Sequence, residues 1–423
     1  MRLRLTGLWR HGDFMKLWAG QTISQFGSHI GGGALRYTAI LILGATPLQL
    51  SLLAAAQMLP MLLLGLLAGV WVDRLRRRPI LIAADLGRGL LLLSVPLAYL
   101  LGLLRIEQLY LVAALAGALA IFFDVAYGAF LPSVVGRERL IEGNSKLSAS
   151  DSVAEIAGPP AGGALVQLIS APLAIVFDAI SFLASALAIG LIGVPEPAPA
   201  ATHGQPSLRR DLAEGLRVVL YNPLLRALLV VGVILSLFGN IIGTLYDVYL
   251  IRDLGMSPAI VGLTVGVGGI SALFGAFAAG PVVARFGVGP TLGGVLALHI
   301  MTATLIPLAH GPLALPMILI SQASDILFAI YFINETSLRQ AITPQRLLGR
   351  VNATFSFVTT GAGLGGALLG GVLGELLGAR AAIAVGVLGA FLACLWVFGS
   401  PLRRLRAAPA PAELVEDPAV VMA

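Results

Sequence analysis

The chain of 423 residues has a formal net charge of +6, but only 11% of its residues are charged and its mean hydropathy is +0.94. A soluble protein carries about a quarter charged residues, so this composition excludes a soluble globular domain. A helix needs about 20 predominantly apolar residues to cross a bilayer. Many such stretches occur here, separated by short polar breaks, and they predict an all-α polytopic membrane protein.

Taken in chain order, the apolar stretches predict twelve transmembrane helices. Their approximate ranges are 14–43, 49–72, 79–104, 108–131, 145–170, 172–193, 222–251, 258–284, 290–310, 313–335, 349–377 and 380–400. The basic segment before the first stretch lacks a compact apolar core and a small-residue cleavage site, so we do not interpret it as a signal peptide.

The positive charges predict the orientation in the membrane. Of the 27 lysines and arginines, about 22 fall on one side of the predicted bilayer, including those of the turn DRLRRR at 73–78. The positive-inside rule makes this side and both termini cytoplasmic. Because the arginines are spread over loop ends rather than along one face, no nucleic-acid partner is expected. We expect a plasma-membrane protein, and the abundance of Ala, Gly, Leu and Arg suggests a bacterium.

Several other functional classes have no support in the sequence. The single cysteine, Cys394, allows neither an internal disulfide nor a thiolate metal site. The two lysines do not complete the phosphate-binding loop of ATPases, and the five histidines do not fall at metal-ligand spacing. We therefore expect no metal, no cofactor and no enzyme activity, and we expect an ion gradient to drive any transport.

The widest polar gap, 194–223, divides the stretches into six and six. Its second part places Leu208, Leu212, Leu216 and Val219 on one helical face, which predicts a short helix at the membrane surface. The expected domains are an N-terminal six-helix bundle at 1–193, a cytoplasmic linker at 194–221, a C-terminal six-helix bundle at 222–400 and a cytoplasmic tail at 401–423.

The two halves also resemble each other in sequence. Gly69 and Arg74 at the end of the second stretch recur 211 residues later as Gly280 and Arg285. An Arg-Leu pair after the fourth stretch recurs after the tenth, 207 residues later. A parallel internal repeat of about 208 residues explains both matches, so we expect two pseudo-symmetric bundles.

The turn after the second stretch reads GVWVDRLRRR and resembles the G-x-x-x-D-R-x-G-R-[RK] signature of the major facilitator superfamily. The matching residues are Gly69, Asp73, Arg74, Arg77 and Arg78, while Arg76 replaces the second glycine. The resemblance implies that Asp73 acts as a latch that closes the cytoplasmic side against the eleventh helix. Arg350, at the expected start of that helix, is a suitable partner for it.

The fifth stretch carries AEIAGPPAGG, which resembles the antiporter signature of the drug:proton branch. Its matching residues are Gly158, Pro159, Gly162 and Gly163, while Ala154 replaces the leading glycine. Four further stretches between 14 and 193 resemble the macrolide-efflux and siderophore-exporter-like branch. An arginine typical of the fourth helix in many drug antiporters is missing from 108–131, so the usual proton relay does not transfer directly.

Charges within membrane spans are costly unless paired or hydrated, so they mark functional positions. We expect proton coupling at four acids: Glu155, Asp325, Asp124 and Asp151. Two of them, Asp151 and Glu155, are four residues apart and share one helix face. The alternative is that the acids form structural ion pairs with Lys146, Arg137 or Arg36. We interpret the Asp85–Arg88 pair, Asp178 and His299 as structural.

Polar and aromatic residues on the helices that line the cavity in this family are candidates for substrate contact. These are Arg36, Gln25, His29, Tyr127, Phe238, Asn240, Tyr246 and Tyr331. They could form a mixed aromatic and polar wall for an amphipathic ligand. Ordinary helix packing explains the aromatic residues equally well.

The sequence as a whole predicts a monomeric exporter of small amphipathic molecules, drug-like, macrolide-like or siderophore-like, that exchanges them for protons by rocker-switch alternating access. A proton-coupled importer on the same fold and a non-transporting membrane sensor or scaffold are the alternatives. An intramembrane enzyme would need a cluster of catalytic side chains that the sequence does not offer.

Overall fold

The computed structural model describes residues 7–72, 74–194 and 208–407, and over these ranges the regular secondary structure is helical, with no strand. The α-helices are α1 (Gly12–Tyr37), α2 (Pro47–Val72), α3 (Arg77–Leu100), α4 (Ile106–Val135), α5 (Leu140–Ile169), α6 (Ala171–Gly190), α7 (Leu208–Tyr221), α8 (Pro223–Val248), α9 (Pro258–Phe286), α10 (Val288–Ala303), α11 (Leu305–Leu308), α12 (Ala314–Ala323), α13 (Asp325–Ile342), α14 (Leu348–Leu377) and α15 (Ala379–Gly399). The prediction of an all-α fold is confirmed.

Ten helical segments among the described residues are long and apolar enough, by length and composition, to cross a membrane. The first and fifth predicted spans, α1 and α5, are not among the ten although they have 26 and 30 residues. Both are more polar than the other ten, and they pack closely against each other and against α6. Their polar residues can therefore face protein rather than lipid.

The contacts divide the chain into two compact units. Unit 1 consists of Met1–Gln205 with Thr244–Val267, and unit 2 consists of Pro206–Gly243 with Gly268–Ala423. The end of α8 and the start of α9 therefore belong with the helices of the first half. Nothing in the sequence pattern had placed this segment there.

The internal repeat is visible in the helix boundaries. The helices α1 and α8 have the same length, begin 211 residues apart, and both continue into a five-residue π-helix, Thr38–Ile42 and Tyr249–Asp253. Each π-helix is followed by a glycine with positive φ, Gly44 at 63° and Gly255 at 67°. Glycine adopts this conformation without the steric cost that a Cβ atom brings, so the same turn leads into the next helix in both halves.

The later helices follow the repeat with an offset of 208 residues. The helices α5 and α14 each have 30 residues and begin at Leu140 and Leu348. The junction that follows is Ser170 with φ 106° in the first half and Gly378 with φ 83° in the second. Ser170 is the only described residue other than glycine with positive φ, so the first half keeps a backbone shape that normally requires glycine.

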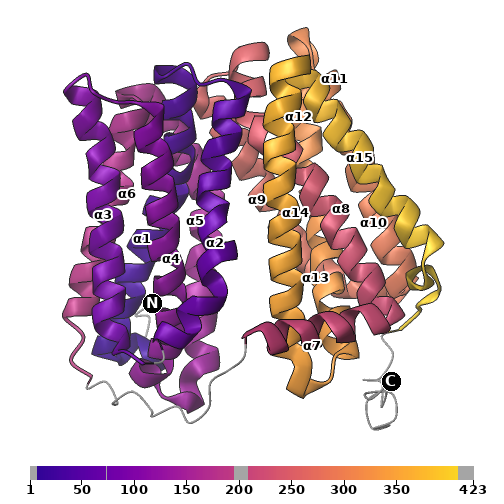
Figure 1. Ribbon diagram of the computed structural model, residues 1–423, viewed down its shortest axis with the longest axis horizontal. Coiled ribbons are helices and arrows are strands. Elements are labelled where there is room, and N and C mark those ends of the chain that lie inside the picture. Colours follow the sequence, from indigo (N-terminus) through magenta and orange to yellow (C-terminus); the bar gives the residue numbers. More distant parts are fainter. Residues whose placement is uncertain (1–6, 73, 195–207, 408–423) are drawn as a thin grey trace, which may run out of the picture. The chain divides into compact units, whose positions relative to one another are not determined.

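In unit 1, α1 packs along α6 with glycines in the seam (Figure 1). A Cβ atom at Gly31 would approach the carboxylate of Asp178, and one at Gly27 would overlap the side chain of Ser181. Because α1 has no side chain at these two positions, the backbones of α1 and α6 approach closely.

In unit 2, α7 runs crosswise to α14 and packs on its first turns (Figure 1). A Cβ atom at Gly215 would lie 2.6 Å from the carbonyl oxygen of Arg350. The buried residue Val219 faces α14, whereas Leu216 is 40% exposed. The helix predicted in the linker is therefore present, but its described apolar residues do not all face one partner. The side chains of Leu208 and Leu212 lie outside the described part of the chain.

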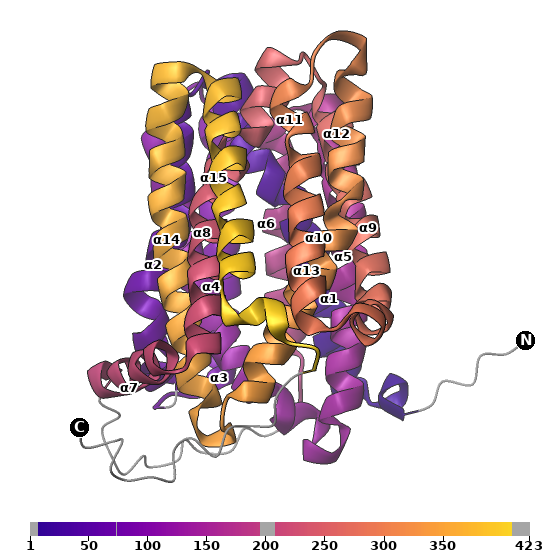
Figure 2. The same cartoon turned by 90° about the vertical axis from the view of Figure 1, so that its right-hand side faces the viewer.

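The tenth predicted span is interrupted in the structure. The helices α12 and α13 follow one another along one line, with a break at Ser324, and α10 lies beside them (Figure 2). The ring Nδ1 of His299 on α10 lies 3.1 Å from the Ser324 hydroxyl and 3.2 Å from its carbonyl oxygen. The break thus brings a polar contact into an otherwise apolar helix pair.

Candidate functional site

The glycines of the AEIAGPPAGG stretch lie within α5 and face the backbones of two neighbouring segments of unit 1. A Cβ atom at Gly162 would lie 2.7 Å from the carbonyl oxygen of Ile30 in α1, and Gly158 faces the same helix. A Cβ atom at Gly163 would overlap the carbonyl oxygen of Pro258 at the start of α9. No larger side chain fits at these positions without moving a backbone.

The two prolines of the stretch also make close contacts, in this case with glycines of α9. The carbonyl oxygen of Pro159 lies against Gly262 of α9, and the ring of Pro160 lies against Gly266. A proline inside a helix removes one backbone hydrogen bond, which in a membrane a neighbouring group must compensate. The stretch therefore joins α5 to α1 and to the first turns of α9 by close backbone contact.

Three of the four predicted coupling acids belong to unit 1, and all three retain exposed surface. Asp124 on α4 and Glu155 on α5 are exposed, and the side chain of Asp151 is 51% exposed. The structure brings Asp151 to a predicted cavity residue, because its Oδ1 lies 3.4 Å from Nε2 of His29. No ion pair within 4.0 Å involves Asp124 or Glu155 among the described residues.

Two of the cations considered as partners for these acids bond elsewhere. Lys146 lies 3.3 Å from Glu142, one helical turn before it in α5. Arg36, in the last turn of α1, donates from Nε to Oδ2 of Asp247 in α8 at 2.7 Å. Asp247 is buried, whereas the side chain of Arg36 is 45% exposed.

A second arginine reinforces this contact between the ends of α1 and α8. Arg252, in the π-helix after α8, donates to the carbonyl oxygens of Ile40 and Ala45, both at 2.8 Å. The π-helix leaves carbonyl groups without their usual α-helical partners, and a guanidinium group satisfies two of them at once. The start of the turn after α1 is thus held by a residue from the equivalent turn of the other half.

The sequence analysis missed Asp247 and Arg252, although one signal pointed to the first. Arg36 and Asp247 are separated by 211 residues, which is the offset of the repeat. They therefore occupy equivalent positions and bond to each other. When equivalent positions of the two halves meet, like charges would repel each other and opposite charges attract. An Arg and an Asp separated by the offset of the repeat therefore indicate a contact between the halves of the sequence.

In unit 2, the fourth predicted acid is the first residue of α13, directly after the helix break. The carboxylate of Asp325 is partly buried and lies against Gly268 of α9, where a Cβ atom would come within 2.5 Å of Oδ2. The equivalent of Asp325 in the first half is Gly117, which faces Gln57. The glycine of the contact is thus on the other helix in the first half, and no acid faces it.

Tyr331, a predicted cavity residue, is 4% exposed within unit 2 and stacks with Phe328 at a ring distance of 6.2 Å. One turn further along α13, Glu335 pairs with Arg339 at 3.7 Å, and the guanidinium of Arg339 lies 4.6 Å from the ring centre of Phe355. The sequence analysis did not single out this buried ion pair.

The remaining cavity candidates have mixed surroundings. Phe238 covers Gly389 of α15, so its ring fills a helix interface as the packing alternative supposed. The amide of Asn240 donates to the carbonyl oxygen of Ser236, one turn earlier in α8. The other three, Gln25, Tyr127 and Tyr246, are partly buried.

The residues of the cytoplasmic signature are only partly described. Asp73 lies outside the described residues, so its role as a latch stays a prediction. Arg78 donates to the carbonyl oxygens of Ile189 and Gly190 at the end of α6, where a cation is favoured by the helix dipole. Arg350 lies 2.7 Å from Glu214 of α7.

Around the other signature residues the structure is more open. Arg74 is exposed, Arg77 lies at the start of α3, and a Cβ atom at Gly69 would meet nothing within 4 Å.

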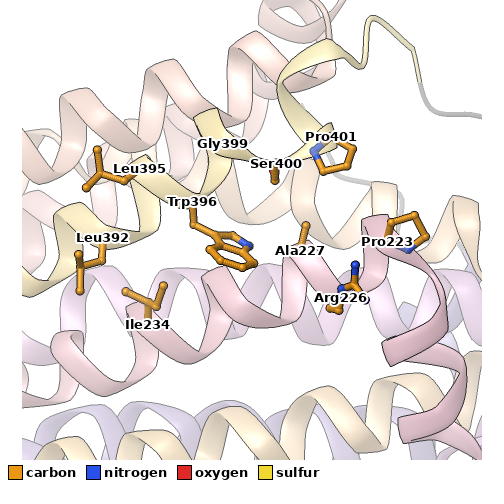
Figure 3. Close-up of a pocket in the computed structure, with 10 residues that line it drawn as sticks. All are labelled: Pro223, Arg226, Ala227, Ile234, Leu392, Leu395, Trp396, Gly399, Ser400 and Pro401. Atoms are coloured by element: carbon orange, nitrogen blue, oxygen red, sulfur yellow. The ribbon is translucent and has the colours of Figure 1, made fainter.

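A groove of about 470 Å³ lies in unit 2 between the start of α8 and the end of α15 (Figure 3). Trp396 projects from α15 towards α8 at its centre, with Ile234 and Leu392 beside it and Arg226 near one end. The lining is mostly apolar and contains none of the predicted site residues. The groove therefore gives no support to the assignment of those residues.

The fold defines a class before any comparison: a helical protein with many segments long and apolar enough to cross a membrane, built from two repeated halves. A model of the Major Facilitator Superfamily matches residues 17–359 and 228–421. The chain belongs to this superfamily, as the signature residues had indicated.

Among its relatives are efflux proteins. The multidrug efflux pump Tap of Mycolicibacterium fortuitum is 28% identical over 374 residues, which cover 86% of this chain and 90% of that protein. The uncharacterized MFS-type transporter YfiS of Bacillus subtilis (strain 168) is 27% identical, with 88% and 89% covered. Macrolide efflux protein A of Streptococcus pyogenes is 24% identical, with 59% and 62% covered.

Solved structures share the fold at low sequence identity. A bacterial homologue of the iron transporter ferroportin in its inward-facing state matches with a TM-score of 0.72 at 20% identity, covering 92% of this chain and 98% of that chain. The nucleoside transporter NupG (D323A mutant) matches with a TM-score of 0.74 at 11% identity, covering 90% and 99%.

Proposed function

We propose that the chain is a proton-driven exporter of small amphipathic molecules in a bacterial plasma membrane, with both termini in the cytoplasm. The family makes it a membrane transporter, and the efflux proteins among its relatives support export. Proton antiport, the substrate class and the orientation are the parts that we propose.

One observation supports proton coupling most directly. Asp124 and Glu155 are exposed on helices whose sequences place them inside the membrane, and Asp151 is half exposed beside His29. A carboxylate facing hydrocarbon costs about 3 kcal/mol or more at the centre of a helix. These surfaces must therefore face water, and acids on a water-filled passage can take up and release protons.

Alternating access assigns roles to the other contacts. In this proposal the bonds of Arg36 and Arg252 hold the outer ends of α1 and α8 together in one state and break in the other. The signature residues Gly69, Asp73, Arg74, Arg77, Arg78 and Arg350 act at the cytoplasmic end when that end closes. The glycine seam of α5 lets helices slide at close distance while these ends exchange.

The test is efflux of ethidium and of erythromycin from cells and their uptake into inside-out vesicles, with and without an uncoupler. The variants are Glu155→Gln, Asp151→Asn, Asp124→Asn and Asp325→Asn. We expect at least one to lose about ten-fold or more of the proton-driven flux, the size expected when a group that exchanges protons is lost. Glu107→Gln, at the exposed start of α4, is the matched control and should leave flux unchanged.

Each outcome decides between the alternatives. Flux that persists in the presence of the uncoupler would overturn the energy source. Accumulation in right-side-out vesicles with an inward proton gradient would support the importer instead. Ligand binding without any flux in either direction would support the sensor or scaffold.

A further inference from the structure

The core of unit 1 contains a group of charges that the mechanism above does not use. Asp85 and Arg88 on α3 and Asp178 on α6 are 0%, 9% and 6% exposed. Nη2 of Arg88 donates to Oδ1 of Asp85. The guanidinium lies between two aromatic rings, 4.5 Å from the centre of Phe123 and 4.2 Å from that of Phe182. Such a site is dry, and charges in it must be compensated.

The charges do not balance. Arg88 interacts electrostatically with Asp124 and Asp178 as well as with Asp85. One guanidinium thus serves three carboxylates, which would leave two negative charges if all three were ionised. Because burying an uncompensated carboxylate costs several kcal/mol, at least one of them must hold a proton.

Geometry identifies which carboxylate this is. Asp85 touches the guanidinium directly and can keep its charge. Asp124 is exposed, so water can solvate it. Asp178 is buried, and its side-chain partners are hydroxyl groups, with Oγ of Ser28 on α1 donating to Oδ1 at 3.3 Å and Ser181 on its own helix as the other. Hydroxyl groups stabilise a carboxylate less than a cation does, and they can also accept a hydrogen bond from a neutral carboxyl.

The groups that face Asp178 come from three neighbouring helices. From α1 it meets Ser28 and the backbone at Gly31, and from α3 it meets Arg88. From α4, Asp124 interacts electrostatically with the same arginine. Among the described residues, Arg88 is the cation that acts on it.

The second half shows that packing alone does not require these charges. At the equivalent positions it carries His299 for Arg88, Leu296 for Asp85, Gly386 for Asp178 and Phe332 for Asp124. The same helix crossings are therefore stable with three neutral residues and one histidine. Replacing a buried ion pair by apolar residues is often neutral or stabilising, so charges retained in only one half point to function.

We propose that Asp178 is a proton-binding site of the first half, set by Arg88 and Asp85 and reached from the exposed carboxylate of Asp124. This deepens the proposed function and rests on its proton coupling. No bond other than O–H changes: the proton leaves one carboxylate oxygen of Asp178 for water or for Asp124 and returns by the same route.

The position of Asp178 also gives the proton a mechanical effect. Its carboxylate lies against Gly31 of α1 without an intervening side chain. When the proton leaves, the negative charge must gain water or move towards Arg88, and either change displaces α1. Arg36 follows Gly31 by five residues, about one and a half turns, so the movement reaches the ion pair with Asp247.

The test uses the whole protein in liposomes without any substrate. Infrared difference spectra between pH 5 and pH 9 should contain the carbonyl stretching band of a protonated carboxyl that shifts in D₂O. Asp178→Asn should remove this band, and Asp124→Asn should leave it. Asp85→Asn releases Arg88 from its partner, so the band should disappear at a lower pH.

A more conservative variant tests the proposal even if Asp178→Asn does not fold. Ser28→Ala removes only the hydroxyl that donates to Asp178, and it should shift the pH midpoint of the band without removing it. The proposal is overturned if a folded Asp178→Asn protein keeps the band, or if Ser28→Ala and Asp85→Asn both leave its midpoint unchanged. Uncoupler-resistant efflux by the unaltered chain would instead overturn the proposed function, whatever the spectra show.

Discussion

The seam between α1 and α6 in the first half and the seam between α8 and α15 in the second are the same crossing built in opposite ways. In the first, glycines at 27 and 31 on α1 leave room for Ser181 and Asp178 on α6. In the second, Phe238 and Ile242 on α8 fill the space beside Gly389 and Gly386 on α15. The larger side chain has changed helix, and the polar seam has become apolar.

The same helix crossing is thus compatible with a polar and with an apolar seam. The buried side chains of each half can therefore differ in chemistry without a change of fold. The first half places its buried charges on α3 and α6, around Arg88. The second half places its own on α13, with Asp325 at the helix break and the Glu335–Arg339 pair about three to four turns further on. Equivalent positions in the other half are neutral or carry histidine.

The most direct test of this comparison places the acid of the first half, Asp178, at the equivalent position of the second half. Gly386→Asp should lower the free energy of unfolding by more than about 3 kcal/mol, because Ile242 and the carbonyl oxygen of Phe238 occupy the space and the second half has His299 where the first has Arg88. Unfolding of the purified protein by SDS would measure it. Gly239→Ala, where a Cβ atom meets nothing within 4 Å, is the control. Near-normal stability of Gly386→Asp would show that the two seams are not specialised.

The junctions after α5 and α14 offer a smaller test with opposite signs. Ser170 holds φ 106° and ψ 156°, a region that costs a residue with a side chain about 1–3 kcal/mol. Ser170→Gly should therefore stabilise the protein and Gly378→Ser should destabilise it, each within that range. The two variants are controls for each other in the same unfolding assay. Changes of equal sign would contradict the equivalence of the junctions.

The smallest effect is expected at Asp13, which precedes the first predicted span. Oδ1 of Asp13 accepts from Nζ of Lys16 at 2.8 Å and from the amide of Gly193 at 3.1 Å. These bonds lower the pKa of Asp13 below its ordinary value of 3.8. Its stabilising effect is therefore complete above that ordinary value and is lost as the pH falls through the lower folded-state pKa.

Asp13→Asn should cost about 0.2–1 kcal/mol near pH 7, as surface ion pairs do. Thermal unfolding of both proteins along a pH series would measure this difference, which should vanish once the pH has fallen through the lowered pKa of Asp13. A difference that grows on acidification would contradict the sign of the shift.

Much of the fold follows from the sequence because membrane helices leave a strong signal. Long apolar stretches predicted the helices, and two short matches at nearly equal offsets predicted the repeat that the boundaries of α1 and α8 display. The π-helices before Gly44 and Gly255 were not predicted. They arise from hydrogen-bond register at a helix end, which residue type does not specify.

The site was harder to predict because a helix that is apolar all round does not reveal which face meets protein. Phe238 was considered for the cavity wall and instead covers Gly389. Asp178 was interpreted as structural because its neighbours, one cation and two hydroxyl groups, come largely from other helices. Only the three-dimensional contacts show that its charge lacks a partner of its own.

Alternating access is the central claim, and it can be tested at Arg36 and Asp247. In a Cys394→Ala background, which removes the buried native cysteine, both residues are changed to cysteine and joined by a short bifunctional thiosulfonate reagent. Joining them should stop ethidium efflux, and cleavage of the link by a reductant should restore it, whereas the reagent should not change the efflux of either single-cysteine variant. Undiminished efflux by fully linked protein would show that α1 and α8 need not part, and it would contradict the account.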